Sequence, residues 1–171
     1  MKVSSKSFDS GGVMARQYTQ YGDNISPHIG WSDFPAETVT FILMVDNADN
    51  PGGVWNHLMV FDIPYNVTEF GENQISAGNI GVNSYGEQRW MGPYPTNALN
   101  QQYEFKMYAL SQRLDVSAAL GSKDIMKDAQ NYVIDVGLSV VQYFKPDSSF
   151  GGTTESPSNM MGPMGTGELP A

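Results

Sequence analysis

The feature that most constrains the fold is the run at residues 38–45, where β-branched and other apolar residues fill nearly every position. A strand with one solvent-exposed face alternates polar and apolar residues, whereas a strand covered on both faces is apolar almost throughout. We therefore expect this run to be a central strand of a sheet. Its longest apolar stretch, residues 41–45, is far shorter than the roughly 20 residues that cross a bilayer.

Two further segments have the composition of strands. Residues 55–63 are mostly apolar and end before Pro64, and residues 103–110 alternate large apolar with charged side chains, as in a half-exposed strand. Repeated glycines and prolines punctuate the intervening residues 65–102. A structureless loop of that length is uncommon in a compact domain, so we expect short strands or functional loops within it.

A helix is predicted near the C-terminal end of the domain. Ser122 is a suitable N-cap, and the apolar residues after it keep helical spacing, which fits one amphipathic helix or two in series. These apolar residues are Ile125, Met126, Ala129, Val133, Val136 and Val140. Residues 140–144, before Pro146, are expected to form the last strand.

Composition and charge exclude several classes of function. The chain of 171 residues suits one domain with a tail, and the absence of cysteine excludes disulfides, thiolate catalysis and thiolate zinc sites. Nine Lys and Arg against 18 Asp and Glu give a net charge of −9, which repels nucleic acid and anionic lipid head groups. We therefore expect no nucleic-acid partner and no membrane insertion.

The two ends of the chain are both polar. No apolar run of a signal peptide follows Met1, which predicts a cytoplasmic protein. Residues 1–146 are assigned to the domain, and residues 147–171 to a Gly-, Pro- and Met-rich tail that cannot build a core. The tail is either a solvated segment or a docking segment, since methionine packs adaptably into irregular grooves. The candidate docking residues are Met160, Met161, Met164 and Leu169.

The chain has two histidines. His28 follows a proline in a turn-like segment and is expected in a surface loop without a catalytic role. His57 begins a predicted strand and follows a polar loop that contains Asp46 and Asp49. Carboxylates beside an imidazole favour its charged form, which can hold an anion. The alternative is a hydrogen-bonded structural histidine.

Common catalytic and metal-binding patterns do not occur in the sequence. The polar loop lacks the alternating oxygen ligands and the sixth-position glycine of a calcium loop. Asp46 and Asp49 could form an acid–base pair, but aspartate beside asparagine and proline is commonest in turns. The chain also lacks the nucleophile elbow, the zinc-binding helix motif and the phosphate-binding loop. We therefore expect no metal and no cofactor.

Short motifs follow one another in a distinctive order along about residues 3–145. They are Tyr18-Thr19, residues 22–27, Trp31, Pro35, residues 45–51, residues 55–57, Ile63-Pro64, residues 81–86, residues 92–95 and residues 103–110. Each motif alone is unspecific, but their order and spacing resemble the phosphatidylethanolamine-binding protein family. The likeness is greatest to its bacterial Raf-kinase-inhibitor-like branch.

The resemblance implies a compact, mainly β fold, with two antiparallel sheets in a sandwich-like arrangement and one or two short C-terminal helices. It also implies a small surface pocket for phosphate-like anions, lined by three segments of the chain. The ligand-binding positions that it implies here are Asp49, Pro51, His57, Pro95, Gln101 and Tyr103.

Three pocket positions depart from the family pattern. Asn47 stands where the pattern has an aspartate, Thr96 where it has a second proline, and Gln101 where it has a second histidine. Glutamine donates a hydrogen bond but cannot become cationic, and a neutral hydrogen bond contributes about 0.5–1.5 kcal/mol against about 1.5–3 kcal/mol for a charged one. We expect a pocket of preserved shape that binds phosphate-like anions weakly.

These observations leave three hypotheses. The first is a non-catalytic binding module for a small phosphate-type anion, because neither Asn47 nor Gln101 can exchange protons as a partner of His57. The second is a structural subunit of a larger assembly, such as a virion, in which the tail docks on neighbouring subunits. The third, a regulator of a kinase or protease partner, rests on family analogy alone.

Overall fold

Two antiparallel sheets are the framework of the structure, a computed structural model that describes residues 1–97 and 99–146. The small sheet has the order β1 (Lys2–Ser4), β2 (Ile29–Ser32), β5 (Glu69–Phe70). The large sheet has the order β6 (Asn79–Ile80), β4 (Trp55–Pro64), β3 (Thr40–Asn47), β7 (Gln101–Leu110), β8 (Val133–Tyr143). The helical elements of the described residues are a 3-10 turn, η1 (Arg16–Tyr18), and α1 (Ser122–Ala129). The predicted mainly β, two-sheet fold is confirmed.

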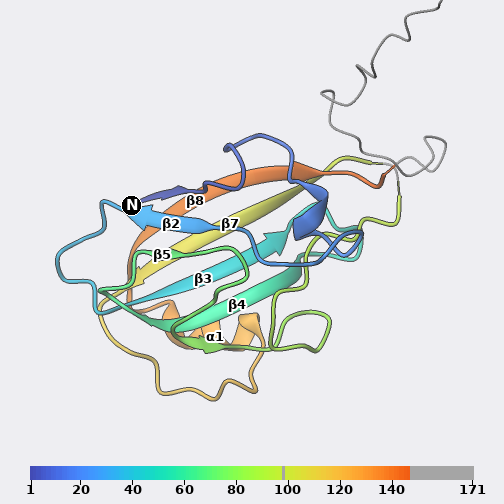
Figure 1. Ribbon diagram of the computed structural model, residues 1–171. Coiled ribbons are helices and arrows are strands. Elements are labelled where there is room, and N and C mark those ends of the chain that lie inside the picture. The colour runs from blue at the N-terminus through green and yellow to red at the C-terminus, as the bar shows by residue number, and fades with distance from the viewer. Residues whose placement is uncertain (98, 147–171) are drawn as a thin grey trace, which may run out of the picture.

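The large sheet is covered on both faces. Figure 1 shows the small sheet on one side of it and α1 on the other. The cluster between the sheets includes Trp31 and Phe70 from the small sheet, packed edge to face at a ring separation of 5.4 Å. The cluster under α1 is built around Ile125 and Ala129, which are fully buried. The domain therefore has three layers and two apolar cores.

Strand β3 is the central strand that the apolar run predicts. It pairs with β4 on one side and β7 on the other, and all eight of its residues are buried. Alternate side chains enter the two cores: Leu43 and Val45 face the small sheet, whereas Ile42 and Met44 face α1. Each core depends on this strand, because the side-chain period of two divides its residues equally between the faces.

Strand β4 contains a β-bulge near its start, at the end of the large sheet that carries Asp46 and Asn47, which we call the polar end. Val45 of β3 pairs with Leu58 and Asp46 pairs with Asn56, so His57 is left without a partner across the pair. Such a bulge redirects the side chains that follow it. As a result, His57 and Leu58 both face the small-sheet side, whereas Asn56 faces the α1 side.

The helix prediction is correct in place but wrong in extent and in its cap. Helix α1 ends at Ala129, and its N-cap is Gly121 rather than Ser122. Val133, Val136 and Val140 lie in β8, paired with β7. Spacings of three and four residues suit one face of a helix, but pairing with the ten-residue strand β7 decides for a strand here.

The remaining segments largely follow the predictions. Residues 65–102 contain the short strands β5 and β6, as expected. None of the helices in the described part of the chain is long and apolar enough to cross a membrane. The predicted docking residues Met160, Met161, Met164 and Leu169 lie outside the described residues.

We expect that Gly92→Ala lowers the free energy of unfolding by about 1–3 kcal/mol, the usual cost of overpacking a buried position. A Cβ atom at Gly92 would collide with the carbonyl oxygen of Tyr18. The flanking backbone cannot move freely, because Asn24 and Gln20 hold its N–H and C=O at 2.8 and 2.9 Å. Urea denaturation gives the measurement.

Gly52→Ala is the matched control, because its Cβ would meet only the side-chain nitrogen of Asn50 at 3.4 Å and its φ is not positive. Equal unfolding free energies for the two variants would contradict the role assigned to Gly92.

Candidate functional site

A cavity of about 250 Å³ lies at the polar end of the large sheet, on the face toward the small sheet. Strand β3 ends here, strands β4 and β7 begin here, and two loops complete the wall. The lining residues are Asn47, Asn50, Pro51, Trp55, His57, Tyr85, Tyr94, Pro95, Thr96, Asn97, Gln101 and Tyr103. The structure thus brings together residues from three segments that are up to 56 positions apart in sequence, from Asn47 to Tyr103.

Cross-strand pairing builds the floor of the cavity. Asn47 pairs with Tyr103 across β3 and β7, and its side-chain amide donates to Gln101 Oε1 at 2.6 Å. The Tyr103 hydroxyl lies 3.4 Å from the same oxygen. Because the Gln101 oxygen is engaged by these two donors, its NH₂ group is the part of that side chain that can donate to a ligand.

His57 is held in one tautomer. Its Nδ1–H donates to the Met91 carbonyl oxygen at 2.6 Å, so Nε2 carries the lone pair of the neutral imidazole. Nε2 is buried and has no hydrogen-bond partner among the described residues. The ring packs edge to face on Tyr103 at a centroid separation of 5.2 Å. An acceptor nitrogen at a cavity wall is suited to a ligand that brings a proton.

The expectation that carboxylates keep His57 charged is wrong. Burial lowers the pKa of His57 below its ordinary value of 6.5, and the opposing hydrogen bond to Met91 and charge of Asp46 are smaller effects. Asp46 acts weakly because it lies on the other face of the sheet, 2.8 Å from Lys106 Nζ. The neutral imidazole is therefore the resting form at pH 7.

Aromatic rings form the sides of the cavity, and sequence reasoning did not assign them to it. Tyr85 packs edge to face against Trp55 at 5.4 Å and against His57 at 5.7 Å. Tyr94 stacks on Tyr21 at 4.7 Å. Trp55 and Tyr85 both lie inside the motifs that carry the family resemblance, so the signal was present in the sequence. Burial raises the pKa of Tyr85 and of Tyr103, so both hydroxyls stay protonated.

Of the six predicted ligand-binding residues, all but Asp49 line the cavity. Asp49 instead fastens its loop to β7, since its carboxylate accepts the Gln102 backbone N–H at 2.8 Å. Its own N–H donates to Asn47 Oδ1 at 3.0 Å, an Asx turn that orders the loop. Asp49 therefore orders the loop at the edge of the cavity but does not line the cavity.

The cavity wall is uncharged when His57 is neutral. Among the described residues, none of those lining it is Asp, Glu, Lys or Arg. This composition is unusual for a chain of net charge −9. The described residues also hold no group of three His, Cys, Asp or Glu side chains placed to bind a metal. The wall instead offers amides, hydroxyls and one imidazole.

His28 lies in the irregular segment before β2, as the sequence suggested, but its side chain is buried and not on the surface. It is 8% exposed, with Nδ1 accepting from the Lys6 N–H at 3.0 Å and Nε2 lying 2.8 Å from Glu69 Oε2. The N-terminal segment and β5 close over it. It fastens these two segments together away from the cavity.

Comparison with known proteins gives a consistent result. A family model described as "Phosphatidylethanolamine-binding protein" matches residues 4–144. The chain belongs to the phosphatidylethanolamine-binding protein family. A UPF0098 protein of Aquifex aeolicus is 36% identical over 132 residues, which are 73% of this chain and 77% of that protein.

Two crystal structures share the fold. The phosphatidylethanolamine-binding protein homologue CT736 of Chlamydia trachomatis is 27% identical, with a TM-score of 0.80 over 85% of this chain and 97% of its own. YbcL of Escherichia coli, described as a member of the mammalian family, is 22% identical with a TM-score of 0.78, over 85% and 98% of the two chains. The second likeness concerns the fold alone.

The burial of His57 predicts a pH dependence of stability. Because its pKa is lower in the folded chain than the ordinary 6.5, the unfolded chain binds the proton more readily. The stabilisation is complete above pH 6.5 and is lost as the pH falls below it, with a slope of at most about 1.4 kcal/mol per pH unit. Urea titrations from pH 8 to pH 5 measure it.

His57→Gln removes the titratable imidazole but keeps a polar side chain at this position. The difference in unfolding free energy between wild type and variant is expected to shrink below pH 6.5. Parallel curves would show that His57 does not titrate as its burial implies.

Proposed function

We propose that this protein is a non-catalytic binding module whose His57 cavity takes a small phosphate- or sulfate-type anion. One observation carries the proposal: an imidazole and a free amide converge on a cavity that has no carboxylate on its described wall, in a strongly acidic chain. An anion placed elsewhere on such a surface meets repulsion. The cavity volume of about 250 Å³ suits a phosphate ester with a few carbon atoms.

In this proposal each polar group has a role. The Gln101 NH₂ donates to one anion oxygen, and His57 Nε2 shares a proton with another. A monoanionic phosphate brings that proton itself, whereas a fully ionised anion requires His57 to be protonated first. In both cases the bound form has the proton between Nε2 and oxygen, so the charged hydrogen bond forms only on binding.

Weak binding without turnover follows from the same residues. Asn47 and Gln101 cannot exchange protons at neutral pH, and Tyr103 has a raised pKa. His57 therefore lacks a partner for general acid–base catalysis. Gln101 also supplies a neutral contact where a second histidine would supply a charged one, which costs roughly tenfold in affinity.

Sulfate titrations at constant ionic strength test this proposal, because sulfate does not titrate between pH 8 and pH 5. The affinity of wild type is expected to rise as the pH falls, by at most about tenfold per pH unit, because binding requires protonated His57. Calorimetry or NMR measures the affinity. His57→Gln is expected to bind more weakly and to lose this added pH dependence.

The converse variant is Gln101→His, which adds a second titratable donor to the floor. It is expected to bind phosphoethanolamine about tenfold more tightly below pH 6.5. If wild type gives no signal at millimolar phosphoethanolamine, or if His57→Gln binds as well as wild type, the anion site is excluded.

One observation favours the second candidate, a subunit of a larger assembly. Strand β8 lies at the edge of the large sheet, and three of its apolar side chains are exposed by 40–53%: Ile134, Val136 and Leu138. They lie on one face of the strand, because they alternate along it. Apolar side chains grouped in this way are typical of protein contact surfaces.

Sedimentation velocity over a wide concentration range tests the assembly proposal. If β8 or the tail mediates self-association, wild type forms oligomers, and either Leu138→Lys or deletion of residues 147–171 reduces their size. A monomer at all concentrations for the full chain would exclude self-assembly through this surface.

A further inference from the structure

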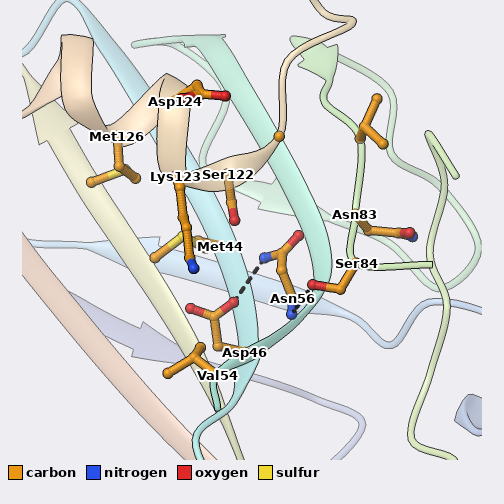
Figure 2. Close-up of a pocket in the computed structure, with 12 residues that line it drawn as sticks. Met44, Asp46, Val54, Asn56, Asn83, Ser84, Ser122, Lys123, Asp124 and Met126 are labelled. Atoms are coloured by element: carbon orange, nitrogen blue, oxygen red, sulfur yellow. Dashed lines mark hydrogen bonds between the residues drawn. The ribbon is translucent and has the colours of Figure 1, made fainter. Parts of the chain in front are cut away.

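A second, larger cavity of about 420 Å³ lies on the other face of the large sheet. Figure 2 shows it between the polar ends of β3 and β4 and the first turn of α1. It arises from the same two dipeptides as the His57 cavity. In each dipeptide the first side chain faces this cavity (Asp46, Asn56) and the second faces the His57 cavity (Asn47, His57). The two cavities therefore lie on opposite faces of the sheet at the same end.

Asn56 is the central polar group of this cavity. It is 3% exposed, and its Nδ2 donates to Asp46 Oδ1 at 2.8 Å and to the Leu58 carbonyl at 3.1 Å. These acceptors fix the orientation of the amide. Its Oδ1 has no hydrogen-bond partner among the described residues. In Figure 2 this oxygen lies on the side of the amide away from Asp46.

The missing partner has an energetic consequence. A buried acceptor without a donor costs about 1–3 kcal/mol. A ligand that carries an N–H group to Asn56 Oδ1 recovers that cost, so the cavity favours a donor at this position.

The sheet side of the cavity is also acidic. Asp46 is 3% exposed and pairs with Lys106 Nζ at 2.8 Å, while Glu104 lies 3.5 Å from the same nitrogen. Burial opposes the charge of Lys106, but the contacts with Asp46 outweigh it and raise the pKa of the lysine. Asp46 and Glu104 share the Lys106 ammonium, and Figure 2 shows the Lys123 side chain extending from α1 toward Asp46. Asp46 is the carboxylate on the sheet side of the wall, and it favours a cationic group in the ligand.

The helix side has the opposite character. The N-cap of α1 is Gly121, which provides no side-chain cap for the N–H groups of the first turn and pairs with Val82 in a parallel bridge. The helix dipole adds a partial positive charge there, and Lys123 lines the cavity beside it. Asp124, also on the wall, partly offsets this charge. Carboxylates bind readily to such helix ends.

Apolar side chains complete the wall between these two sides. Met44 and Met126 contribute from β3 and α1, and Val54 and Val82 from the loops. A cavity of about 420 Å³ lies within the range of roughly 300–1,000 Å³ that small-molecule sites occupy. A ligand therefore needs an apolar part as well as two charged groups.

We propose that this cavity binds a small zwitterion of the α-amino-acid class with an apolar side chain. Its ammonium group donates to Asn56 Oδ1 and faces Asp46, and its carboxylate accepts from the first-turn N–H groups of α1 and from Lys123. Its side chain packs against the two methionines. The site is separate from the His57 cavity and does not depend on the anion that binds there.

Calorimetric titration of the full chain with L-leucine tests this assignment. Two analogues each lack one charged group: isoamylamine has no carboxylate and 4-methylpentanoate has no ammonium. Leucine is expected to bind at least about tenfold more tightly than either analogue, since each loses one set of charged hydrogen bonds. No binding of leucine at tens of millimolar, or equal binding of leucine and either analogue, overturns the proposal.

Variants at exposed positions locate the site without disturbing the core. Lys123→Gln is expected to weaken leucine binding about three- to tenfold, and Val54→Trp to block the cavity. Lys127→Gln is the matched control, because Lys127 lies on the same helix but does not line the cavity. His57→Gln should leave leucine binding unchanged. If Lys123→Gln and Lys127→Gln behave alike, or if His57→Gln abolishes binding, leucine is not bound here.

Discussion

Strand β3 is buried on both faces, and the rest of the structure depends on this burial. Its alternate residues supply the core between the sheets and the core beneath α1, so neither layer can pack without it. The alternation continues beyond the apolar part of the strand. Asp46 takes the next position on the α1 face and Asn47 the next on the small-sheet face. Polar groups thus reach both faces at the same end of the sheet.

The bulge at His57 makes the two faces chemically different. Without the extra residue, regular alternation would place Leu58 on the face opposite His57. With it, the imidazole joins Tyr103 and Gln101 on one face, while Asn56 joins Asp46 on the other. The two cavities share neighbouring backbone positions. The charge of Asp46 still acts on His57 through the sheet, although burial has the larger effect on its pKa.

The pattern of apolar residues predicted the strands well. A strand buried on both faces is apolar throughout, whereas a strand with one exposed face alternates apolar and polar residues. Of the six residues that the family resemblance implied, all but Asp49 lie on the cavity wall, but the aromatic rings of Trp55, Tyr85 and Tyr94 were not among them. Three predictions failed for reasons outside local sequence. Val133, Val136 and Val140 suit a helix or a strand until β7 offers a partner, His28 is covered by distant segments, and the charge state of His57 depends on its burial. Each outcome requires contacts between residues far apart in the chain.

The sequence by itself determined that three segments are strands, that β3 is central and which residue types are available to bind a ligand, whereas the mainly β, two-sheet fold was implied by the family resemblance. The first three follow from side-chain chemistry and from periodicity, which act locally. Only the tertiary structure decided that His57 is neutral, that Asp49 binds the Gln102 N–H instead of lining the cavity, and that His57 Nε2 and Asn56 Oδ1 have no hydrogen-bond partner among the described residues. Protonation and hydrogen-bond satisfaction depend on which groups exclude water, and distant strands and α1 provide those groups.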